Sequence, residues 1–321
     1  FTIRQKNLFV FFLDTLRMFI RTRRLKITAT VDMEFFSRAS AILAYLTGAT
    51  NRVGLHRFTS ELPYRGDLMT HRVQYNPYLH TSKAYLMLVD ALDRYPKETP
   101  LSKIKSEDLI VEAPQFAPAE DEKQKVEQIL VQKLGGNLSG PGRDGEGLVS
   151  TGLRPLVLLN PNASDMLPLR KWPTERFVEL GMKILAEFPD VFIAITGAPN
   201  EKEPCENIRK QFNSKRVISV AGDTSLRDLL VLYCRADLLV TNDSGPGHFA
   251  SMTDIKAIVL FGPETPELFG PLGDNTHIIR ENLACSPCVN VFNHRFSPCR
   301  DNVCMKNISV NAVYSKVQEL L

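Results

Sequence analysis

The sequence lacks a large charge of one sign and any long apolar run. Its 321 residues carry a formal net charge of only +3 and no DNA- or RNA-reading motif, so nothing indicates a nucleic-acid-binding protein. The longest apolar run near the start, residues 8–13, is stopped by Asp14 and is far too short to span a bilayer. The chain begins at Phe1 without a charged leader and cleavage site, which predicts neither a secreted protein nor a complete translation product.

The composition is that of a soluble globular protein. Apolar residues make up 44% and charged residues 23% of a chain long enough for two domains with separate cores. From Pro155 onward, strand-length apolar runs alternate with helical patterns, as in a Rossmann-like domain built on a parallel sheet. The expected strands are Leu156–Leu159, Val191–Ile195, Val217–Val220, Leu238–Val240 and Ala257–Phe261, and the expected helices are Thr174–Phe188, Glu203–Asn213, Ser225–Ala236 and Gly247–Met252.

The front of the chain shows a shorter alternation of the same kind. It lacks the opening strand and glycine-rich turn of a Rossmann-like domain, so we expect the second half of a truncated one, with the domain division after residue 117. A charged helix (Glu120–Leu134) and a glycine-rich surface loop (residues 135–152) should follow. The expected front elements are helices over Asn7–Arg24, Phe36–Thr47 and Ser82–Asp93 and strands over Leu25–Val31, Asn51–Leu55 and Asp108–Val111.

The segment Val240–Ala250 carries the clearest chemical pattern. A buried strand ends there, and Gly245 and Gly247 allow the backbone to approach a ligand where a helix begins and its unpaired amides face outward. Asp243 could bind hydroxyl groups, and His248 could bind phosphate or sugar oxygens. The alternative is a plain strand-to-helix turn in which His248 packs or caps.

Loops of similar composition follow the other expected strands of the second block. Because the carboxyl ends of parallel strands line one crevice, these loops should converge on an anionic, hydroxyl-rich ligand. The residues 223–225 are better interpreted as a helix N-cap. The loops are residues 160–164, 196–199, 221–225 and 262–266.

Two adjacent cations, Arg170 and Lys171, lie between the first of these strands and its helix. Either could reach a diphosphate across the crevice, although a surface pair is the alternative. Trp172 and Pro173 are expected to be structural, with the proline at the first helical position. One of the two cations is therefore expected to contact the ligand.

Four of the six cysteines, Cys285, Cys288, Cys299 and Cys304, lie near the end of the chain. Thiolates at this spacing could form a structural zinc site, with His294 as a competing ligand, or they could be plain reduced thiols. Both interpretations stay open at this point.

Polar groups also lie on front-block loops, where acceptor binding and simple solvation are equally compatible with the sequence. They are Arg52-Val53-Gly54, Arg65-Gly66-Asp67, His71-Arg72 and His80.

An amphipathic pattern, Leu8–Ile20, is followed by Arg21, Arg23, Arg24 and Lys26. Such a segment can lie on an anionic membrane surface. The surrounding alternation of helices and strands favours the other interpretation, a helix packed on a sheet with a solvated basic end.

Together these motifs resemble glycosyltransferase family 9, the heptosyltransferase family. The resemblance rests on Asn160-Pro-Asn-Ala, Arg170-Lys-Trp-Pro-x-Glu-Arg-Phe, Thr196-Gly-Ala-Pro, Asn242-Asp-Ser-Gly-Pro-Gly-His-x-Ala and Leu260-Phe-Gly-Pro-Glu-x-Pro, and runs from about Leu25 to Leu321. It implies an α/β fold with two Rossmann-like domains of the glycosyltransferase-B type, residues 1–117 on the acceptor side and 118–321 on the nucleotide-sugar donor side. It further implies inverting transfer of a sugar, typically heptose from ADP-heptose, to a lipopolysaccharide-core or related glycan acceptor.

The resemblance also implies the residues of the donor site. The turn from Asp243 to His248 would hold sugar and diphosphate, Arg170 or Lys171 would pair with phosphate, and Glu201 is a weaker candidate for the ribose. The family's Arg-x-Gly-x-x-Gly-Asp-like loop, which carries the general base, has no match here, so we expect the base upstream of Phe1 or absent. The implied donor-binding set is Asn160, Asn162, Arg170, Lys171, Thr196, Gly197, Glu201, Asp243, Ser244, Gly245, Gly247, His248, Gly262, Pro263, Glu264 and Thr265.

No Asp-x-Asp triplet occurs, which agrees with transfer that needs no metal or other cofactor. Two other functions stay open: a nucleotide-sugar epimerase on the same fold, which would consume donor with no acceptor present, and a non-catalytic sugar-nucleotide-binding protein. The family resemblance implies a lipid-linked acceptor. We therefore expect a cytoplasmic protein that makes peripheral contact with the inner face of the bacterial inner membrane.

Overall fold

The computed structural model describes residues 7–56, 58, 66–135, 155–293 and 296–321. The chain forms two compact units, Phe1–Val111 and Glu112–Leu321, each described here by itself. The division lies a few residues before the position expected from the sequence, residue 117. The glycine-rich loop expected over residues 135–152 falls almost wholly outside the described residues.

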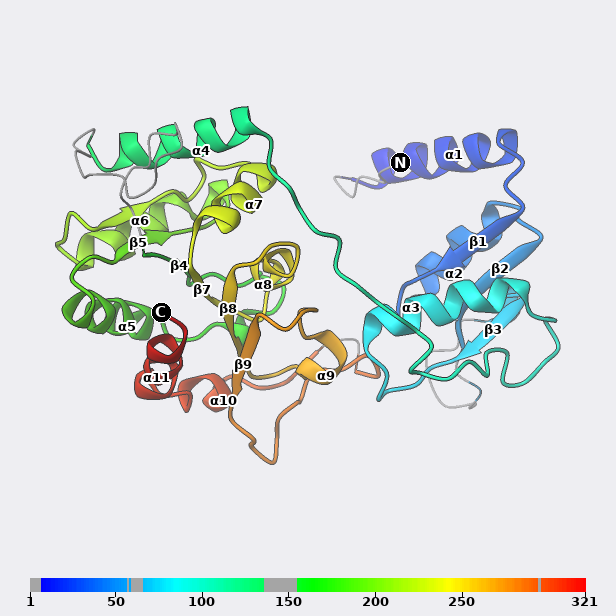
Figure 1. Ribbon diagram of the computed structural model, residues 1–321. Helices are drawn as coiled ribbons and strands as arrows, with labels where there is room; N and C mark the ends of the chain where they lie inside the picture. The colour runs from blue at the N-terminus through cyan, green and yellow to red at the C-terminus, as the bar shows by residue number, and fades with distance from the viewer. Residues whose placement is uncertain (1–6, 57, 59–65, 136–154, 294–295) are drawn as a thin grey trace. The chain divides into compact units, whose positions relative to one another are not determined.

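The second unit is built on a parallel sheet in the order β6-β5-β4-β7-β8-β9 (Figure 1). The chain moves outward from β4 to β6, then returns to the other side of β4 as β7 and continues to β9. This is the doubly wound arrangement of Rossmann folds. The strands are β4 (Leu156–Asn160), β5 (Phe192–Ile195), β6 (Val217–Ser219), β7 (Leu238–Asn242), β8 (Lys256–Phe261) and β9 (Thr276–Arg280).

Helices cover both faces of this sheet. They are α4 (Glu120–Lys133), α5 (Thr174–Glu187), α6 (Lys202–Gln211), α7 (Leu226–Arg235), α8 (Gly245–Ala250), α9 (Pro266–Phe269), α10 (Val303–Lys306) and α11 (Val310–Leu320). Side chains alternate along β4, so that Val157 and Leu159 enter one core with α5, α6 and α11, while Leu156 and Leu158 enter the other with α4 and α7. Burial on both faces explains why the inner strands are almost wholly apolar.

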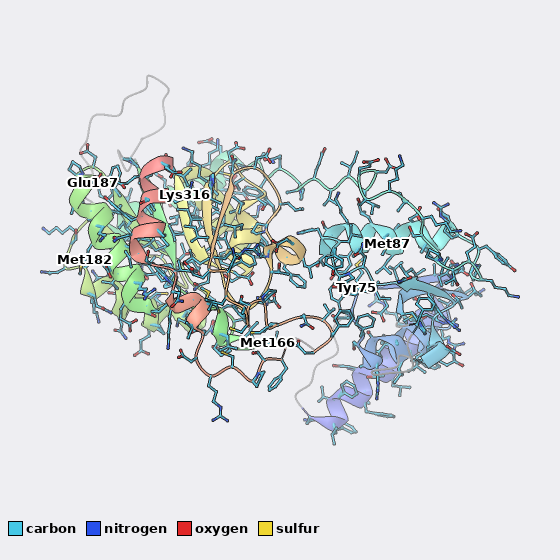
Figure 2. All side chains as sticks on the ribbon, turned by 90° about the horizontal axis from the view of Figure 1, so that it is seen from below. Tyr75, Met87, Met166, Met182, Glu187 and Lys316 are labelled. Carbon is cyan, nitrogen blue, oxygen red and sulfur yellow. The ribbon has the colours of Figure 1, made fainter. Side chains whose placement is uncertain are left out.

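The first unit has a smaller parallel sheet in the order β1-β2-β3. Its strands are β1 (Ala29–Asp32), β2 (Asn51–His56) and β3 (His71–Gln74), and its helices are α1 (Leu8–Arg24), α2 (Arg38–Leu46) and α3 (Thr81–Asp90). Buried side chains of α2 and α3 pack in small apolar clusters, such as Ala41 and Ala44 with Met69. In Figure 2, Tyr75 directly after β3 and Met87 on α3 lie in this unit.

The structure corrects several expected elements. Asp108–Val111 is not a strand, and β1 begins at Ala29 rather than Leu25. The strands β3 and β9 were not expected, because each mixes apolar residues with His and Arg. The helix α8 begins at Gly245, two residues before its expected start at Gly247.

No helix among the described residues is both long and apolar enough to cross a membrane.

Tyr233 on α7 provides a test of the apolar core that lies between the larger sheet and the helices α4 and α7. Its side chain is fully buried, its hydroxyl has no hydrogen-bond partner among the described residues, and burial raises the pKa of the phenol. Because a buried hydroxyl without a partner costs about 1–3 kcal/mol, Tyr233→Phe should raise the free energy of unfolding by about 1 kcal/mol in urea denaturation. Tyr314→Phe is the matched control, since the Tyr314 hydroxyl donates to Glu187 and its loss should not stabilise. A lower free energy of unfolding for Tyr233→Phe than for the parent would contradict the inference that the Tyr233 hydroxyl is buried without a hydrogen-bond partner.

Candidate functional site

The switch point of the doubly wound sheet lies between β4 and β7, where buried amides join the strand ends. Asn160 Nδ2 donates to Thr196 Oγ1 at 3.0 Å, and Asn162 Nδ2 donates to the Thr196 carbonyl at 3.1 Å. From β7, Asn242 Nδ2 donates to the Asn162 carbonyl at 3.0 Å. The expected ligand contacts Asn160, Asn162 and Thr196 are thus buried and engaged with one another, so they fix the loops that follow β4, β5 and β7.

Arg170 lies between two buried carboxylates from neighbouring loops. Its Nη2 is 2.7 Å from Glu264 Oε2, and its Nε is 3.4 Å from Asp243 Oδ2. The Arg170 side chain is 18% exposed, that of Asp243 3% and that of Glu264 2%. The loops after β4, β7 and β8 are therefore tied together by one guanidinium.

This ion cluster changes the role expected for Arg170. The sequence offered Arg170 or Lys171 as the partner of a phosphate, but the Arg170 charge is already shared by Asp243 and Glu264. A guanidinium presents a planar fork of donors that suits two carboxylates, and a buried carboxylate without a cation is costly. We therefore interpret Arg170 as a structural clamp of the site.

Lys171 differs from its neighbours in exposure. It follows the 3-10 turn Pro168–Arg170 and is exposed, between half-buried Arg170 and buried Trp172. Trp172 is held by its Nε1, which donates to the Ile308 carbonyl at 2.9 Å, and by its backbone N–H, which donates to Asn242 Oδ1 at 3.0 Å. Of the two adjacent cations, Lys171 is thus the one that is exposed to solvent.

The turn after β7 combines buried and exposed positions. Asp243 is buried, and Ser244 precedes α8 as its N-cap, whereas Gly245 and His248 are exposed. A Cβ at Gly247 would lie 3.2 Å from Val259 Cγ2, so a glycine is needed for close packing of α8 on β8. His248 thus lies on the exposed side of this turn, and Gly247 acts through packing.

The loop Gly262–Thr265 after β8 rests on the C-terminal segment. A Cβ at Gly262 would lie 2.5 Å from Met305 Sδ, and Ser286 Oγ donates to the Gly262 carbonyl at 2.5 Å. The backbone N–H of Val289 donates to the Pro263 carbonyl at 2.9 Å. This support leaves Glu264 directed into the clamp and Thr265 half-buried at its edge.

Thr265 also contacts Glu267, the second residue of α9. Burial acts to raise the pKa of Glu267, but hydrogen bonds from Arg280 and Thr265 outweigh it and bring the pKa down to about 2. The Thr265 hydroxyl is thus engaged by a carboxylate that stays charged at neutral pH.

The loop after β5 is closely packed at its second residue, Gly197. A Cβ at Gly197 would lie 2.8 Å from Asn162 Nδ2 and 2.9 Å from Cys205 Sγ. Glu201 Oε2 accepts from the Ala198 backbone N–H at 2.7 Å. Glu201, the weaker candidate for the ribose, thus caps the turn that precedes α6.

Two site-forming residues were missed by the sequence analysis. Asn242 was quoted only as part of a motif, although its side chain contacts both Trp172 and Asn162. Asn302 Nδ2 donates to the carbonyls of Leu169 and Lys171, both at 2.9 Å. No local pattern signals Asn302, because its partners lie far away in the sequence.

The cysteines near the end of the chain differ in their immediate contacts. Cys288 Sγ accepts from Ser297 Oγ at 3.2 Å, Cys299 Sγ donates to the Asp301 carbonyl at 3.1 Å, and Cys304 is buried below Gly262. Over the described ranges, which omit His294, no three His, Cys, Asp or Glu side chains gather as they would around a metal ion. A structural zinc at Cys285, Cys288, Cys299 and Cys304 stays a prediction, beside the alternative of reduced thiols.

Most of the polar groups singled out in the front block serve the first unit itself. Arg52 Nε donates to the Leu68 carbonyl at 2.6 Å, and Arg72 pairs with Asp67 at 3.2 Å. His71 is buried, which lowers its pKa, and His80 caps α3. Arg65 lies outside the described residues.

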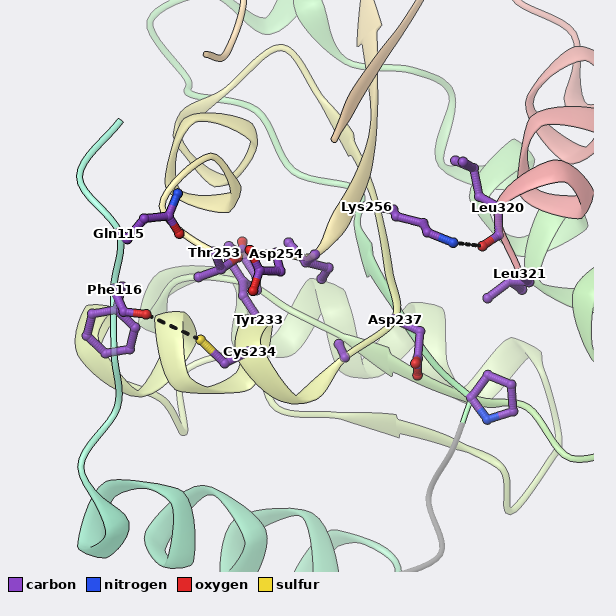
Figure 3. A pocket seen from close by; sticks show the side chains of 13 residues that line it. Gln115, Phe116, Tyr233, Cys234, Asp237, Thr253, Asp254, Lys256, Leu320 and Leu321 are labelled. Atoms are coloured by element: carbon purple, nitrogen blue, oxygen red, sulfur yellow. Dashed lines mark hydrogen bonds between the residues drawn. The ribbon is translucent and has the colours of Figure 1, made fainter. Parts of the chain in front are cut away.

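A cavity of about 380 Å³ lies at the opposite edge of the larger sheet, near the amino ends of β4, β7 and β8 (Figure 3). Its lining includes Asp237, Asp254 and Lys256, whose Nζ donates to the Leu320 carbonyl at 2.6 Å. None of the residues expected to bind the donor lines this cavity.

The second unit is therefore a Rossmann-like domain in which glycines, carboxylates and cations gather at the switch point of a doubly wound sheet. The sequence model of "Glycosyltransferase family 9 (heptosyltransferase)" matches residues 31–295. The chain belongs to glycosyltransferase family 9, which confirms the resemblance found in the motifs.

Individual relatives agree with this assignment. The chain is 26% identical over 166 residues to lipooligosaccharide heptosyltransferase 2 of Campylobacter jejuni, covering 51% of the chain and 50% of that relative. It is 30% identical over 130 residues to lipopolysaccharide heptosyltransferase 2 of Salmonella typhimurium, covering 40% of the chain and 36% of that relative. The matched part of the chain thus spans half or less of each relative's length.

Two solved structures share the fold. ADP-heptose lipopolysaccharide heptosyltransferase II of Escherichia coli has a TM-score of 0.66 at 19% identity, covering 95% of this chain and 80% of that one. The family 9 glycosyltransferase of Veillonella parvula also has a TM-score of 0.66, at 17% identity, covering 95% and 78%. These likenesses confirm the expected α/β fold of the glycosyltransferase-B type.

The clamp can be tested by unfolding. Arg170→Met leaves Asp243 and Glu264 buried without their shared cation, which should lower the free energy of unfolding by about 3–5 kcal/mol. Adding Glu264→Gln removes one of the two carboxylates and should restore part of that loss. Urea denaturation of the two variants measures both effects, with Lys171→Met as a matched control at the exposed neighbouring cation. If Arg170→Met and Lys171→Met are equally stable, Arg170 is not a clamp.

Proposed function

We propose that this protein transfers a sugar, heptose in the first instance, from a nucleotide diphosphate sugar to a lipopolysaccharide-core or related glycan acceptor. The observation that carries the proposal is the arrangement at the switch point of the second unit, in a chain of family 9. There, exposed Lys171 and His248 flank loops that Arg170 holds in place. ADP-heptose is the donor that the relatives favour, since one of the solved structures carries that name.

In this proposal Lys171 neutralises the diphosphate as it leaves the anomeric carbon. The backbone N–H of exposed Gly245, at the start of α8, and the His248 side chain add hydrogen bonds to phosphate or sugar oxygens. An acceptor hydroxyl attacks from the opposite side, which inverts the anomeric configuration. Lys171 and these donors serve the leaving group without a metal. No general base is assigned to the described residues.

The first unit is proposed to receive the acceptor. A core glycan is attached to lipid, so we place the reaction at the cytoplasmic side of a membrane, with peripheral and reversible contact. Membrane contact follows from the chemistry of the acceptor and is separable from donor binding, which belongs to the second unit.

Lys171 and His248 give the sharpest test of the donor site, because both are exposed and can be changed without disturbing the core. Lys171→Met should lower kcat/KM with ADP-heptose by about 100- to 1,000-fold, since it removes a charge that stabilises the leaving diphosphate. His248→Ala should lower it less. Lys215→Met, an exposed lysine before β6, is the matched control and should leave kcat/KM unchanged. Full activity of Lys171→Met with an unaltered melting temperature would contradict the proposed role.

Incubation with donor alone separates the proposed transferase from the two alternatives. A transferase should leave ADP-heptose intact until a core acceptor is added, whereas an epimerase would convert the donor by itself. A binding protein would do neither, yet ADP-heptose would still raise its melting temperature in proportion to the logarithm of ligand concentration. Conversion of donor without acceptor, measured by chromatography of the nucleotide sugars, would refute the transferase assignment.

A further inference from the structure

The side chain of Asn302 reaches back to the segment that carries Lys171. Asn302 lies directly before α10, at the N-cap position, where an asparagine side chain usually accepts from backbone N–H groups of its own helix. Here it makes no such capping bond. Its Nδ2 instead donates to the carbonyls of Leu169 and Lys171, both at 2.9 Å, which lie 133 and 131 residues earlier in the chain.

These two carbonyls lie at the end of the 3-10 turn that precedes Lys171. The backbone bonds of the turn use the carbonyls of Leu167 and Pro168. In the described part of the chain, no backbone N–H donates to the carbonyls of Leu169 and Lys171. A primary amide carries two N–H groups, so one nitrogen can serve both carbonyls at once. Asn302 therefore acts as a side-chain cap for the end of this turn.

The helix that Asn302 precedes is itself fixed to the core of the second unit. Cys304 and Met305 of α10 are buried and belong to the apolar core on the α5 and α11 face of the larger sheet. Both also pack under Gly262, where an added Cβ would lie 3.0 Å from Cys304 Sγ and 2.5 Å from Met305 Sδ. One short helix thus supports the loop after β8 and, through Asn302, the segment after β4.

The Lys171 side chain is exposed and makes no ion pair or hydrogen bond with the described residues. Its backbone is therefore the part of the residue that the fold holds in place. A displacement of about 1 Å in a group that meets the transition state can cost about 100-fold in rate. An anchor on the Lys171 carbonyl therefore matters for the reaction as well as for the fold.

We propose that Asn302 is a positioning residue of the transfer reaction: it fixes the backbone from which the Lys171 side chain reaches the leaving diphosphate. The inference deepens the proposed function and rests on it for the role of Lys171. Asn302 touches neither donor nor acceptor in this proposal, and its effect on the rate passes through Lys171 alone.

A double-mutant cycle with ADP-heptose and a core acceptor tests the proposal. Asn302→Ala and Asn302→Asp both remove the two N–H donors, the second without a change of shape. Each should lower kcat about 10- to 100-fold with a smaller change in KM, because the charge on the diphosphate grows in the transition state. In the Lys171→Met background, Asn302→Ala should lower kcat by less than about twofold, because the charge that Asn302 positions is already absent.

Asn307→Ala is the matched control. Asn307 is an exposed asparagine directly after α10, and its side chain makes no hydrogen bond with the described residues, so both kcat and KM should stay unchanged. Circular dichroism and urea denaturation verify that each variant is folded. An asparagine with a purely structural role would slow the reaction by the same factor with Lys171 present or absent.

An equal fall in kcat on the parent and Lys171→Met backgrounds overturns the proposal, since Asn302 then acts through another part of the site. Full activity of both Asn302 variants overturns it as well. Failure of the proposed function looks different: the parent itself transfers no heptose, or Lys171→Met is as fast as the parent. The positioning role then falls together with the role of Lys171.

Discussion

One guanidinium placed between two buried carboxylates holds the loops of the proposed donor site together. Arg170 meets Asp243 after β7 and Glu264 after β8, while its own segment follows β4. A cluster of one cation and two carboxylates is stable in a low-dielectric environment only when its geometry is kept, so each loop limits the movement of the other two. The exposed groups at the rim, Lys171 and His248, owe their positions to this buried cluster.

The clamp in turn rests on the end of the chain. Trp172 is anchored to the Ile308 carbonyl, Asn302 supports the segment of Arg170 and Lys171, and Met305 fills the space that the missing Cβ of Gly262 leaves. This packing explains why a buried thiol, Cys304, lies next to the loop after β8. Burial raises the pKa of that thiol and keeps it protonated, which suits a packing role.

The alternation of apolar runs with helical patterns made most strands of the larger sheet predictable, because strands buried on both faces are apolar throughout. The polar loops after those strands followed from the same topology, and their convergence at the switch point was correctly anticipated. The strands β3 and β9 were not predicted because each is short and mixes apolar residues with His and Arg. The ion cluster of Arg170 with Asp243 and Glu264 was not predicted. A sequence does not show whether a cation faces a ligand or a carboxylate, and Glu264 is far from Arg170 along the chain.

Arg170 and Lys171 differ in burial and in their partners. Arg170 ends the 3-10 turn Pro168–Arg170 and is half-buried between Asp243 and Glu264, whereas Lys171 follows the turn with an extended backbone and is exposed. Arginine takes the inward position, because its planar fork can serve two carboxylates at once, and lysine takes the outward one as a compact charge on a flexible chain.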